Sequence, residues 1–217
     1  MSRVSLNAVQ AAFQNAFAEK CIAIFLLGYR RARQESLARP DWIENNFSAY
    51  LVFWMNRLPA TERAQMIIGS EDPAERTADE FHAPDFNANE GPRIDITFHN
   101  WENGRRNRFH IEAKNLSERS WRKPNGSKVD ARAYQNRYIA TGIDHFISGR
   151  YRNGCLAAYV VQGDPQACAE QINALLDQQQ RAPERLGSRI NPQSGVLRYR
   201  SQHPGLTLDH LFLTFAN

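Results

Sequence analysis

Apolar and polar residues alternate along two stretches near the middle of the chain, 93–98 and 109–114. Alternation with a period of two is typical of a strand that buries one face and exposes the other. The polar residues 100–107 between the two stretches include Asn103 and Gly104, a pair favoured in hairpin turns. The pattern predicts two antiparallel strands joined by a hairpin connection, each with one apolar and one polar face.

Two amphipathic helices are predicted before this hairpin. Apolar residues recur at spacings of three, four and seven over residues 6–29, which is the periodicity of a helix with a buried side. A second helix is expected to begin at Pro40 and Asp41, to carry an apolar stripe over 43–58 and to end at Pro59, because proline interrupts a helix. Both helices are expected to bury their apolar sides.

The rest of the chain alternates between predicted strands, helices and loops. A continuous apolar run at 155–161 is typical of a strand buried on both faces, and Asp164 followed by Pro165 favours a helix start. In chain order, the other predicted segments are a strand at 65–69, an acidic loop at 70–91, a basic loop at 117–130, helices at 131–147 and 164–179, and strands at 196–201 and 206–215. This order predicts an α/β fold with a mixed central β-sheet flanked by helices.

The length and composition of the chain agree with one compact domain. A chain of 217 residues, 42% of them hydrophobic, can bury about 70% of the surface that it exposes when unfolded. We expect a single domain over residues 1–217, with an added N-terminal helix at 5–30, a core at about 41–162, and a C-terminal helix and strands at 164–217.

Cysteine usage and the apolar runs bear on where the protein is located. The three cysteines form no CxxC pair, so buried free thiols in a reducing compartment are expected rather than disulfides or a zinc site. The N-terminal residues lack the basic and apolar regions of a secretory signal, and the longest apolar run, 21–27, is too short to cross a membrane. These features predict a cytoplasmic protein with no membrane partner.

Basic residues are concentrated in the middle of the chain. The net charge of +4 is small, but residues 91–154 hold 13 Lys+Arg against 6 Asp+Glu, whereas residues 1–90 hold 9 against 12. A local basic excess favours a polyanionic partner such as nucleic acid. Trp101 and Trp121 lie among these residues, and aromatic rings suit base stacking. The predicted nucleic-acid contacts are Arg105, Arg106, Arg108, Arg122, Lys123, Lys128, Arg132 and Arg137.

Three residues with complementary chemistry fall on the polar faces of the two predicted strands. Asp95 lies on the first strand, and Glu112 and Lys114 lie on the second. Paired carboxylates suit Mg²⁺, which binds oxygen ligands and keeps several waters, and Mn²⁺ is expected to substitute. Asp95 and Glu112 would hold the metal, and the amine of Lys114 would orient or deprotonate an attacking water. The set predicts hydrolysis of a phosphodiester; the alternative is a solvated hairpin face with cross-strand ion pairs.

The lysine at position 114 is informative because only four of the 27 basic residues are lysines. Arginine stays charged, whereas an amine can lose its proton at an accessible pKa. Because most basic residues in this chain are arginines, a site that needed only positive charge would be expected to carry arginine. A lysine two residues after Glu112 therefore favours a chemical role for the amine.

Residues 94–96 (Ile-Asp-Ile) and 111–114 (Ile-Glu-Ala-Lys) resemble the signature of the PD-(D/E)XK nuclease superfamily, which has the restriction-endonuclease-like fold. The similarity covers the motif and the order of elements from about residue 41 to 161. It implies a restriction-endonuclease-like core and the same roles for the two carboxylates and the lysine. Arg93 and Ile94 stand where the superfamily has the proline of the motif.

The resemblance also implies further residues. Many members of the superfamily add a glutamate from the helix before the strands, which implies Glu44 as a third metal ligand and catalytic residue; an exposed helix glutamate is the alternative. Gln135 and Tyr138 resemble the Gln and Tyr pair of one branch, with a spacing one residue short. His110 lies on the polar face of the motif and is a third candidate. Gln135, Tyr138 and His110 are therefore the predicted accessory residues. A literal Pro-Asp pair at 84–85 lies in a segment without alternation, and Asp95 is preferred to it.

Two classes of function remain open from the sequence. The first is a Mg²⁺-dependent endonuclease that cleaves DNA, which by resemblance suggests restriction, defence or DNA processing. The second is a catalytically inactive subunit that keeps the nuclease fold and binds nucleic acid within a larger complex. RNA is a weaker candidate substrate than DNA. A homodimer or a regulatory protein partner is compatible with either class.

Overall fold

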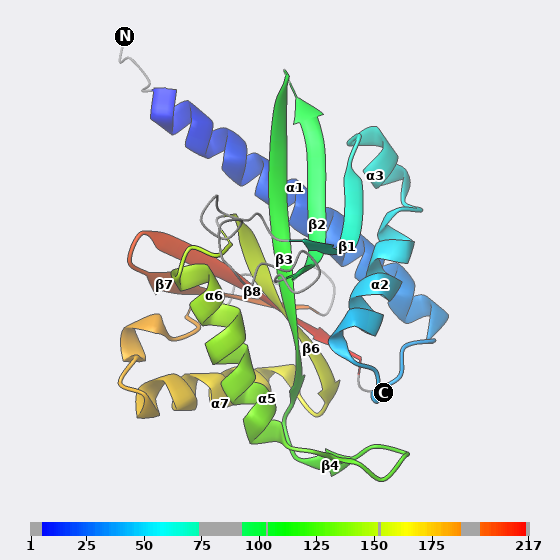
Figure 1. Ribbon diagram of the computed structural model, residues 1–217, viewed down its shortest axis with the longest axis vertical. Coiled ribbons are helices and arrows are strands. Elements are labelled where there is room, and N and C mark those ends of the chain that lie inside the picture. Colours follow the sequence, from blue (N-terminus) through cyan, green and yellow to red (C-terminus); the bar gives the residue numbers. More distant parts are fainter. Residues whose placement is uncertain (1–5, 74–92, 103, 152, 188–195, 216–217) are drawn as a thin grey trace, which may run out of the picture.

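A six-stranded mixed sheet runs through the protein (Figure 1). The strands lie in the order β1-β2-β3-β6-β8-β7; β6 runs parallel to both β3 and β8, and the other neighbours are antiparallel. The strands are β1 (Ile67–Pro73), β2 (Arg93–Glu102), β3 (Arg105–Ser117), β6 (Gly154–Gln162), β7 (Leu197–His203) and β8 (Leu206–Thr214). The fold is therefore α/β, as the sequence predicts.

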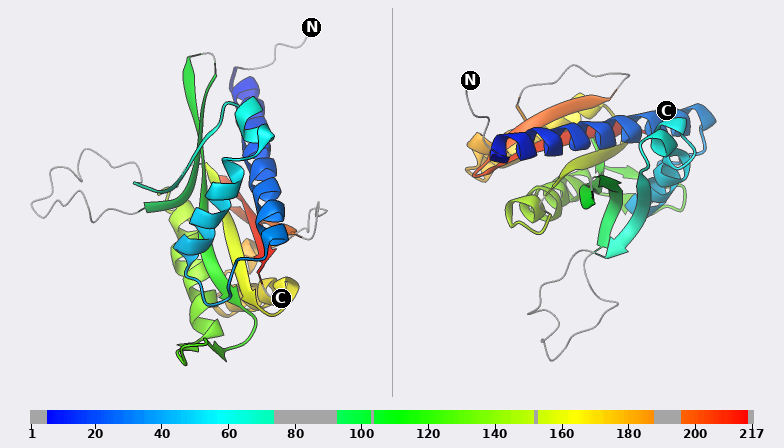
Figure 2. Two further views of the ribbon diagram at one scale, coloured as in Figure 1. Left: turned by 90° about the vertical axis from the view of Figure 1, so that its right-hand side faces the viewer. Right: turned by 90° about the horizontal axis from the view of Figure 1, so that it is seen from above.

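Helices cover both faces of the sheet: α1 crosses one face and α5 lies on the other (Figure 2). The helical elements are α1 (Leu6–Glu35), α2 (Glu44–Met55), α3 (Pro59–Arg63), α5 (Ala131–Arg137), the π-helix η1 (Tyr138–Ile143), α6 (Asp144–Ile147), α7 (Pro165–Gln178) and the 3-10 turn η2 (Ala182–Glu184). A separate small hairpin, β4 (Trp121–Arg122) and β5 (Lys128–Val129), follows β3 within the predicted basic loop. The first helix was predicted over residues 6–29, and in the structure α1 continues to Glu35.

The computed structural model describes residues 6–73, 93–102, 104–151, 153–187 and 196–215. Most of the predicted acidic loop, including the pair Pro84 and Asp85, lies outside these residues. The beginning of that segment was predicted wrongly, because residues 70–73 continue β1 to Pro73 and pair with β2.

The predicted hairpin is present, and its strands are longer than the alternation indicates. β2 continues to Glu102 and β3 begins at Arg105, so polar residues within 100–107 pair across the two strands instead of forming a loop. Gly104 has a φ of 72°, which suits a tight hairpin turn. The additional pairs form an arm that projects from the sheet at the top of Figure 1.

The second predicted helix was wrong at both ends. Asp41 does not cap it: both carboxylate oxygens of Asp41 accept hydrogen bonds from Arg39, at 3.0 and 2.9 Å, and α2 begins only at Glu44. Pro59 does not end it either, since Pro59 lies in the first turn of α3, where a missing N–H costs no hydrogen bond. The later start puts Glu44 in the first turn of α2, where it is buried.

The helix predicted at 131–147 is interrupted by a π-helical stretch. Asp130 caps its start by accepting hydrogen bonds from the backbone N–H groups of Arg132 and Ala133. The widened turn η1 then packs against β6, where a Cβ on Gly142 would come within 2.9 Å of a Leu156 methyl carbon. π-helical turns inside α-helices are frequent at functional sites, and this one lies over the strands that carry the candidate residues.

Two hydrophobic cores fill the space on either side of the sheet. The first is built by α1, α2 and the apolar residues of β2 and β3, among them Phe47, Phe98 and Ile111. The second is built mainly by η1, α6, α7 and the other face of β6 and β8. All three cysteines are buried and free, as the sequence predicts.

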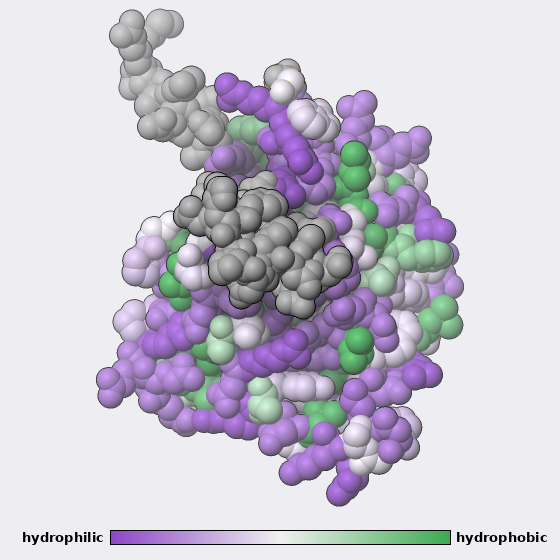
Figure 3. Space-filling view, in the orientation of Figure 1, coloured by the Kyte–Doolittle hydropathy of each residue, from purple (hydrophilic) through white to green (hydrophobic). Residues whose placement is uncertain are grey.

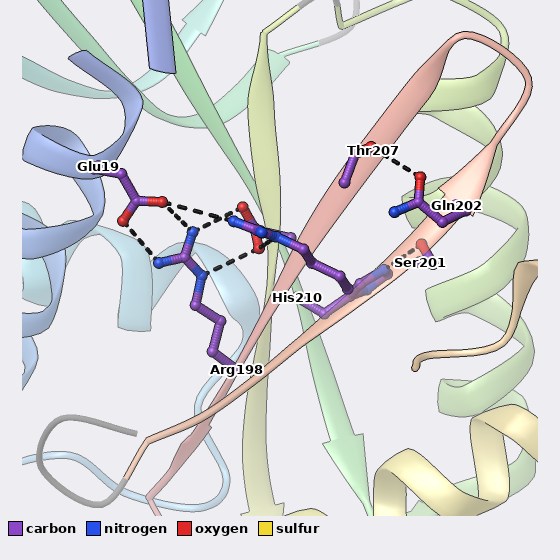
Figure 4. Close-up of polar contacts among 8 residues, drawn as sticks. Glu19, Arg198, Ser201, Gln202, Thr207 and His210 are labelled. Atoms are coloured by element: carbon purple, nitrogen blue, oxygen red, sulfur yellow. Dashed lines mark hydrogen bonds and ion pairs between the residues drawn. The ribbon is translucent and has the colours of Figure 1, made fainter. Parts of the chain in front are cut away.

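A charged network ties α1 to the far edge of the sheet. The guanidinium of Arg198 on β7 donates to Glu19 on α1 and to Asp209 on β8, and Arg200 donates to Asp209 at 2.9 Å (Figure 4). The hydrogen bonds from Arg198 hold the pKa of Asp209 below its usual range, against the effect of burial. The network fixes the helix that forms one layer of the first core.

A chain of buried hydrogen bonds lies within the second core. The hydroxyl of Tyr138 contacts Nδ1 of His210 at 2.9 Å, and Ser201 Oγ contacts Nε2 of His210 at 2.8 Å and Nε2 of His203 at 2.7 Å. His203 then meets the Glu184 carboxylate at 3.0 Å. Ser201 is fully enclosed, so this arrangement serves to satisfy buried polar groups.

We expect His210 to remain neutral in the folded protein far below pH 6.5, because burial, followed by the nearby His203, lowers its pKa to about 3. The unfolded chain takes up a proton on this group near its ordinary pKa of 6.5. The contribution of His210 to the free energy of unfolding is therefore complete above that value and falls by about 1.4 kcal/mol per pH unit as the pH drops towards the folded-state pKa.

Ring ¹⁵N chemical shifts of selectively labelled histidine, followed while the pH is lowered, measure this directly. The ring resonances of His210 are expected to keep neutral values over the range in which exposed histidines titrate. A His210 titration midpoint near the ordinary histidine pKa would contradict the expectation. Replacement of His210 by glutamine assigns its signals.

Candidate active site

The hairpin brings Asp95, Glu112 and Lys114 together. Asp95 Oδ2 accepts a hydrogen bond from the backbone N–H of Ala113 at 2.7 Å, so the Asp95 carboxylate reaches across to β3. Glu112 and Lys114 lie two residues apart on β3 and share one face of the strand. Lys114 Nζ donates to Glu112 Oε1 in an ion pair. Two carboxylates and one amine thus converge, as the alternation predicts.

Burial sets the electrostatics of this group. Asp95, Glu112 and Lys114 are 8%, 5% and 4% exposed, which excludes the alternative of a solvated hairpin face. Burial, and then the charge of Glu112, raise the pKa of Asp95 to about 8 against the opposing effect of Lys114. Burial also raises the pKa of Glu112, again against the effect of Lys114. One ammonium does not fully compensate two buried carboxylates.

Lys114 is held in a fixed position. Its Nζ donates to the backbone carbonyl oxygen of Ala113 at 2.9 Å as well as to Glu112. An ammonium group has three N–H donors, so one donor remains after these two hydrogen bonds. The amine is therefore positioned next to both carboxylates and keeps the capacity to contact a substrate or a water.

The donor set fits a hard divalent cation. Glu112 Oε2 is buried and accepts no hydrogen bond of regular geometry, although the Tyr151 hydroxyl interacts with the Glu112 carboxylate. A buried carboxylate oxygen that is incompletely paired is costly unless a ligand completes it. Within the described residues, no group of three or more His, Cys, Asp or Glu side chains could hold a metal ion. Mg²⁺ commonly binds proteins through one or two carboxylates and completes its shell with waters and substrate phosphate. Asp95 and Glu112 supply that number of carboxylates.

Glu44 lies next to the site but is engaged by other groups. Its Oε1 accepts a hydrogen bond from the backbone N–H of Asn115 at 3.0 Å, and its Oε2 accepts one from Arg137 at 2.9 Å. Asn115 also donates its side-chain amide to the carbonyl of Trp42 at 2.9 Å. Glu44 adds negative charge that raises the pKa of Asp95, but in this arrangement it joins α2 to β3 and α5 and is not grouped with the carboxylate pair.

The three predicted accessory residues lie in different surroundings. Tyr138 is fully buried in the second core and contacts His210. Gln135 is buried and donates to Gln171 Oε1 at 2.6 Å, joining α5 to α7. His110 lies on β3 one pair beyond Glu112, on the same face, so it is the accessory residue that the structure brings towards the site.

Two further residues lie near the site, and the sequence singled out neither of them as a site residue. Tyr151 follows α6 and is buried, and its pKa is raised by burial and then by the charge of Glu112. His145 on α6 has a lowered pKa, caused by burial and then by the charges of Arg150 and Lys114. Neither residue lies in a stretch with strand alternation, so the sequence carries no signal for them.

The basic residues predicted to bind nucleic acid lie on three elements around the site. They are Arg105, Arg106 and Arg108 on the arm, Arg122, Lys123 and Lys128 on the β4–β5 hairpin, and Arg132 and Arg137 on α5; all except Arg108 and Lys123 are exposed. The arm and the β4–β5 hairpin lie at opposite ends of β3, with the carboxylate pair between them (Figure 1).

Some of these basic side chains also hold the structure together. Lys123 Nζ donates to the carbonyl of Asp41 at 2.9 Å, and Arg132 donates to Gln178 Oε1 at 2.6 Å. Hydrophilic side chains cover the tip of the arm and the lower hairpin in Figure 3. The basic groups are therefore distributed along a surface and do not form a single cluster.

Comparison of the chain with protein-family models, with curated proteins and with solved structures found no match. The resemblance to the PD-(D/E)XK superfamily consequently stays a prediction based on the motif and the order of elements. In the parts of the chain that the structure describes, no helix is long and apolar enough to cross a membrane.

Proposed function

We propose that the protein is a metal-dependent nuclease that hydrolyses DNA phosphodiester bonds at the site formed by Asp95, Glu112 and Lys114. The observation that carries the proposal is the buried pair of carboxylates, Asp95 and Glu112, beside the single buried ammonium of Lys114. Burying such a group lowers the stability of the folded protein, and a role in binding a cation would account for its presence.

Each residue has a role that follows from its position. Asp95 and Glu112 would hold Mg²⁺ or Mn²⁺, and such an ion would supply positive charge next to the scissile phosphate. Lys114, fixed by Ala113 and Glu112, orients the attacking water through its remaining N–H or, once it has lost its own proton, accepts the proton of the water. The buried setting strengthens these interactions, since electrostatic effects weaken in bulk water.

The surroundings of the site support a polyanionic substrate. Exposed arginines and a lysine lie on both sides of the carboxylate pair, on the arm and on the β4–β5 hairpin. We propose DNA in preference to RNA, and a restriction, defence or DNA-processing role in the cytoplasm. A homodimer or a regulatory protein partner belongs to the same proposal.

A second candidate is a binding subunit that keeps the fold without the activity. It is favoured by one observation: the described residues supply two carboxylates but no group of three side chains that could hold a metal. In this case Lys114 and Glu112 would serve only as a buried ion pair. The two candidates differ in a single observable, the breakage of phosphodiester bonds.

Incubation with supercoiled plasmid and Mg²⁺ or Mn²⁺ separates them. If the protein is a nuclease, nicked or linear plasmid is expected with metal and none is expected when EDTA is present. The control variant Lys20→Met removes an exposed lysine on α1 and is expected to cleave as fast as wild type. Binding of the plasmid without cleavage under either metal would support the binding subunit instead. Competition by RNA of matched length, at one stated salt concentration, tests the choice of substrate.

A further inference from the structure

The arm formed by β2 and β3 carries a row of side chains that begins at the carboxylate pair. Alternate residues of a strand share a face, so the face that holds Asp95 and Glu112 continues towards the tip of the arm. The cross-strand pairs along it are Thr97 with His110, His99 with Arg108, and Trp101 with Arg106. The row changes from acidic at the site to aromatic and basic at the tip.

Trp101 is the prominent member of this row. It is 63% exposed, far more than a tryptophan that contributes to a core. Arg106 lies directly opposite Trp101 on β3 and is exposed. The exposed Ile67 of β1 lies opposite His99, which is two residues from Trp101 on β2. An open aromatic face next to a guanidinium suits a nucleic-acid strand, because a base stacks on the ring and a phosphate pairs with the arginine.

The row also fixes the distance between the tip and the site. Trp101 lies six residues from Asp95 on β2, and Arg106 lies six residues from Glu112 on β3. At a rise of about 3.3 Å per residue, the tip is about 20 Å from the carboxylates. A strand that reaches from the site to Trp101 therefore extends several nucleotides beyond the phosphate that is cleaved.

We infer that the arm is a second contact for the nucleic acid and binds a single-stranded segment, with one base stacked on Trp101 and a phosphate paired with Arg106. An unpaired base is required because the faces of paired bases are covered by their neighbours in a duplex. The inference rests on the proposed binding of nucleic acid but does not depend on hydrolysis. It gives the arm a positioning role, since the arm lies away from the reacting atoms.

Fluorescence anisotropy with labelled single-stranded and duplex DNA of the same sequence tests the inference. The assay contains EDTA, so binding is measured without metal and without cleavage. Trp101→Ala is expected to weaken single-strand binding about tenfold, and Trp101→Phe to keep most of the affinity, because a phenyl ring still stacks. Arg106→Ala is expected to lower the slope of log affinity against log salt concentration by about one, as the loss of one phosphate contact predicts.

Two further variants serve as comparisons. Arg105 pairs with Glu102 on the opposite face of the arm, so Arg105→Ala is expected to weaken binding less than Arg106→Ala. Lys20→Ala removes an exposed charge from α1 and is expected to leave affinity within about twofold of wild type. Circular dichroism and thermal unfolding confirm that each variant is folded.

Each remaining outcome overturns the inference. Equal losses on single-stranded and duplex DNA would mean that the arm contacts the duplex and not an unpaired base. No loss in Trp101→Ala or no recovery in Trp101→Phe would contradict stacking of a base on Trp101. A larger loss in Arg105→Ala than in Arg106→Ala would contradict the phosphate contact of Arg106. A protein that binds as expected but never cleaves plasmid would keep this inference while the nuclease proposal fails.

Discussion

Replacement of Lys114 by methionine is expected to lower the rate of plasmid cleavage by about 10²–10⁴-fold. Methionine keeps most of the aliphatic length of lysine, so the buried space stays filled, but the amine next to Glu112 is lost. The attacking water then loses the group that orients it or, as the neutral amine, takes its proton. Cleavage rates at saturating Mg²⁺, measured for wild type and variant under the same salt conditions, give the effect.

The controls separate chemistry from folding. Lys20→Met makes the same substitution at an exposed position on α1, and its cleavage rate is expected to equal that of wild type. Lys114→Met is expected to keep its affinity for DNA, because the lysine is buried and the DNA contacts lie elsewhere. Retention of the full cleavage rate by a folded Lys114→Met protein would show that the amine has no part in the reaction.

Replacement of Asp95 by asparagine is expected to produce two opposite effects. Without metal, the variant is expected to be more stable than wild type by about 1–3 kcal/mol near neutral pH. On folding, the wild type must either take up a proton on Asp95 or bury its charge beside Glu112, and a neutral amide does neither. The amide oxygen can still accept the hydrogen bond from Ala113 N. With metal, the variant is expected to lose both the stabilisation by the ion and the cleavage of DNA.

The pH dependence of this stability difference has a definite sign. The pKa of Asp95 is raised from 3.8 to about 8 in the folded protein, so the folded state binds this proton more tightly than the unfolded chain does. The contribution of the protonated group is complete below the unfolded value and is lost as the pH rises through the folded value. The advantage of Asp95→Asn is therefore expected to shrink as the pH falls from about 8 towards 4.

Urea unfolding of both proteins, with EDTA and with Mg²⁺, measures these effects. An ion present at about 100 times its dissociation constant stabilises the wild type by about 2.7 kcal/mol. The variant is expected to show no such gain. A variant that is less stable than wild type without metal, or that gains as much from Mg²⁺, would mean that Asp95 is a structural residue.

The sequence was sufficient to predict the hairpin and the convergence of its polar residues. Alternation depends only on the geometry of a strand, so it assigned Asp95, Glu112 and Lys114 to one face without knowledge of the rest of the fold. It underestimated the length of the strands, because the residues near the turn are polar on both faces, and even the buried Asn100 shows no apolar alternation. The arm with Trp101 consequently became visible only in the structure.

The burial and partners of the site could not be predicted from local patterns. Glu44 contacts the backbone of Asn115 and the side chain of Arg137, which lie far away in the sequence. The start of α2 was misplaced because Asp41 pairs with Arg39 and does not cap the helix. Such contacts depend on how distant segments of the chain pack, so the structural preferences of single residues do not predict them.

The central claim is that Asp95 and Glu112 together hold a divalent metal ion. Anomalous X-ray diffraction from crystals soaked in Mn²⁺, measured on both sides of the manganese absorption edge, tests it most directly. The account predicts one strong anomalous peak between the two carboxylates, in contact with Glu112 Oε2, and no peak in crystals of Asp95→Asn. The absence of manganese between these carboxylates in wild-type crystals that bind it elsewhere would contradict the account.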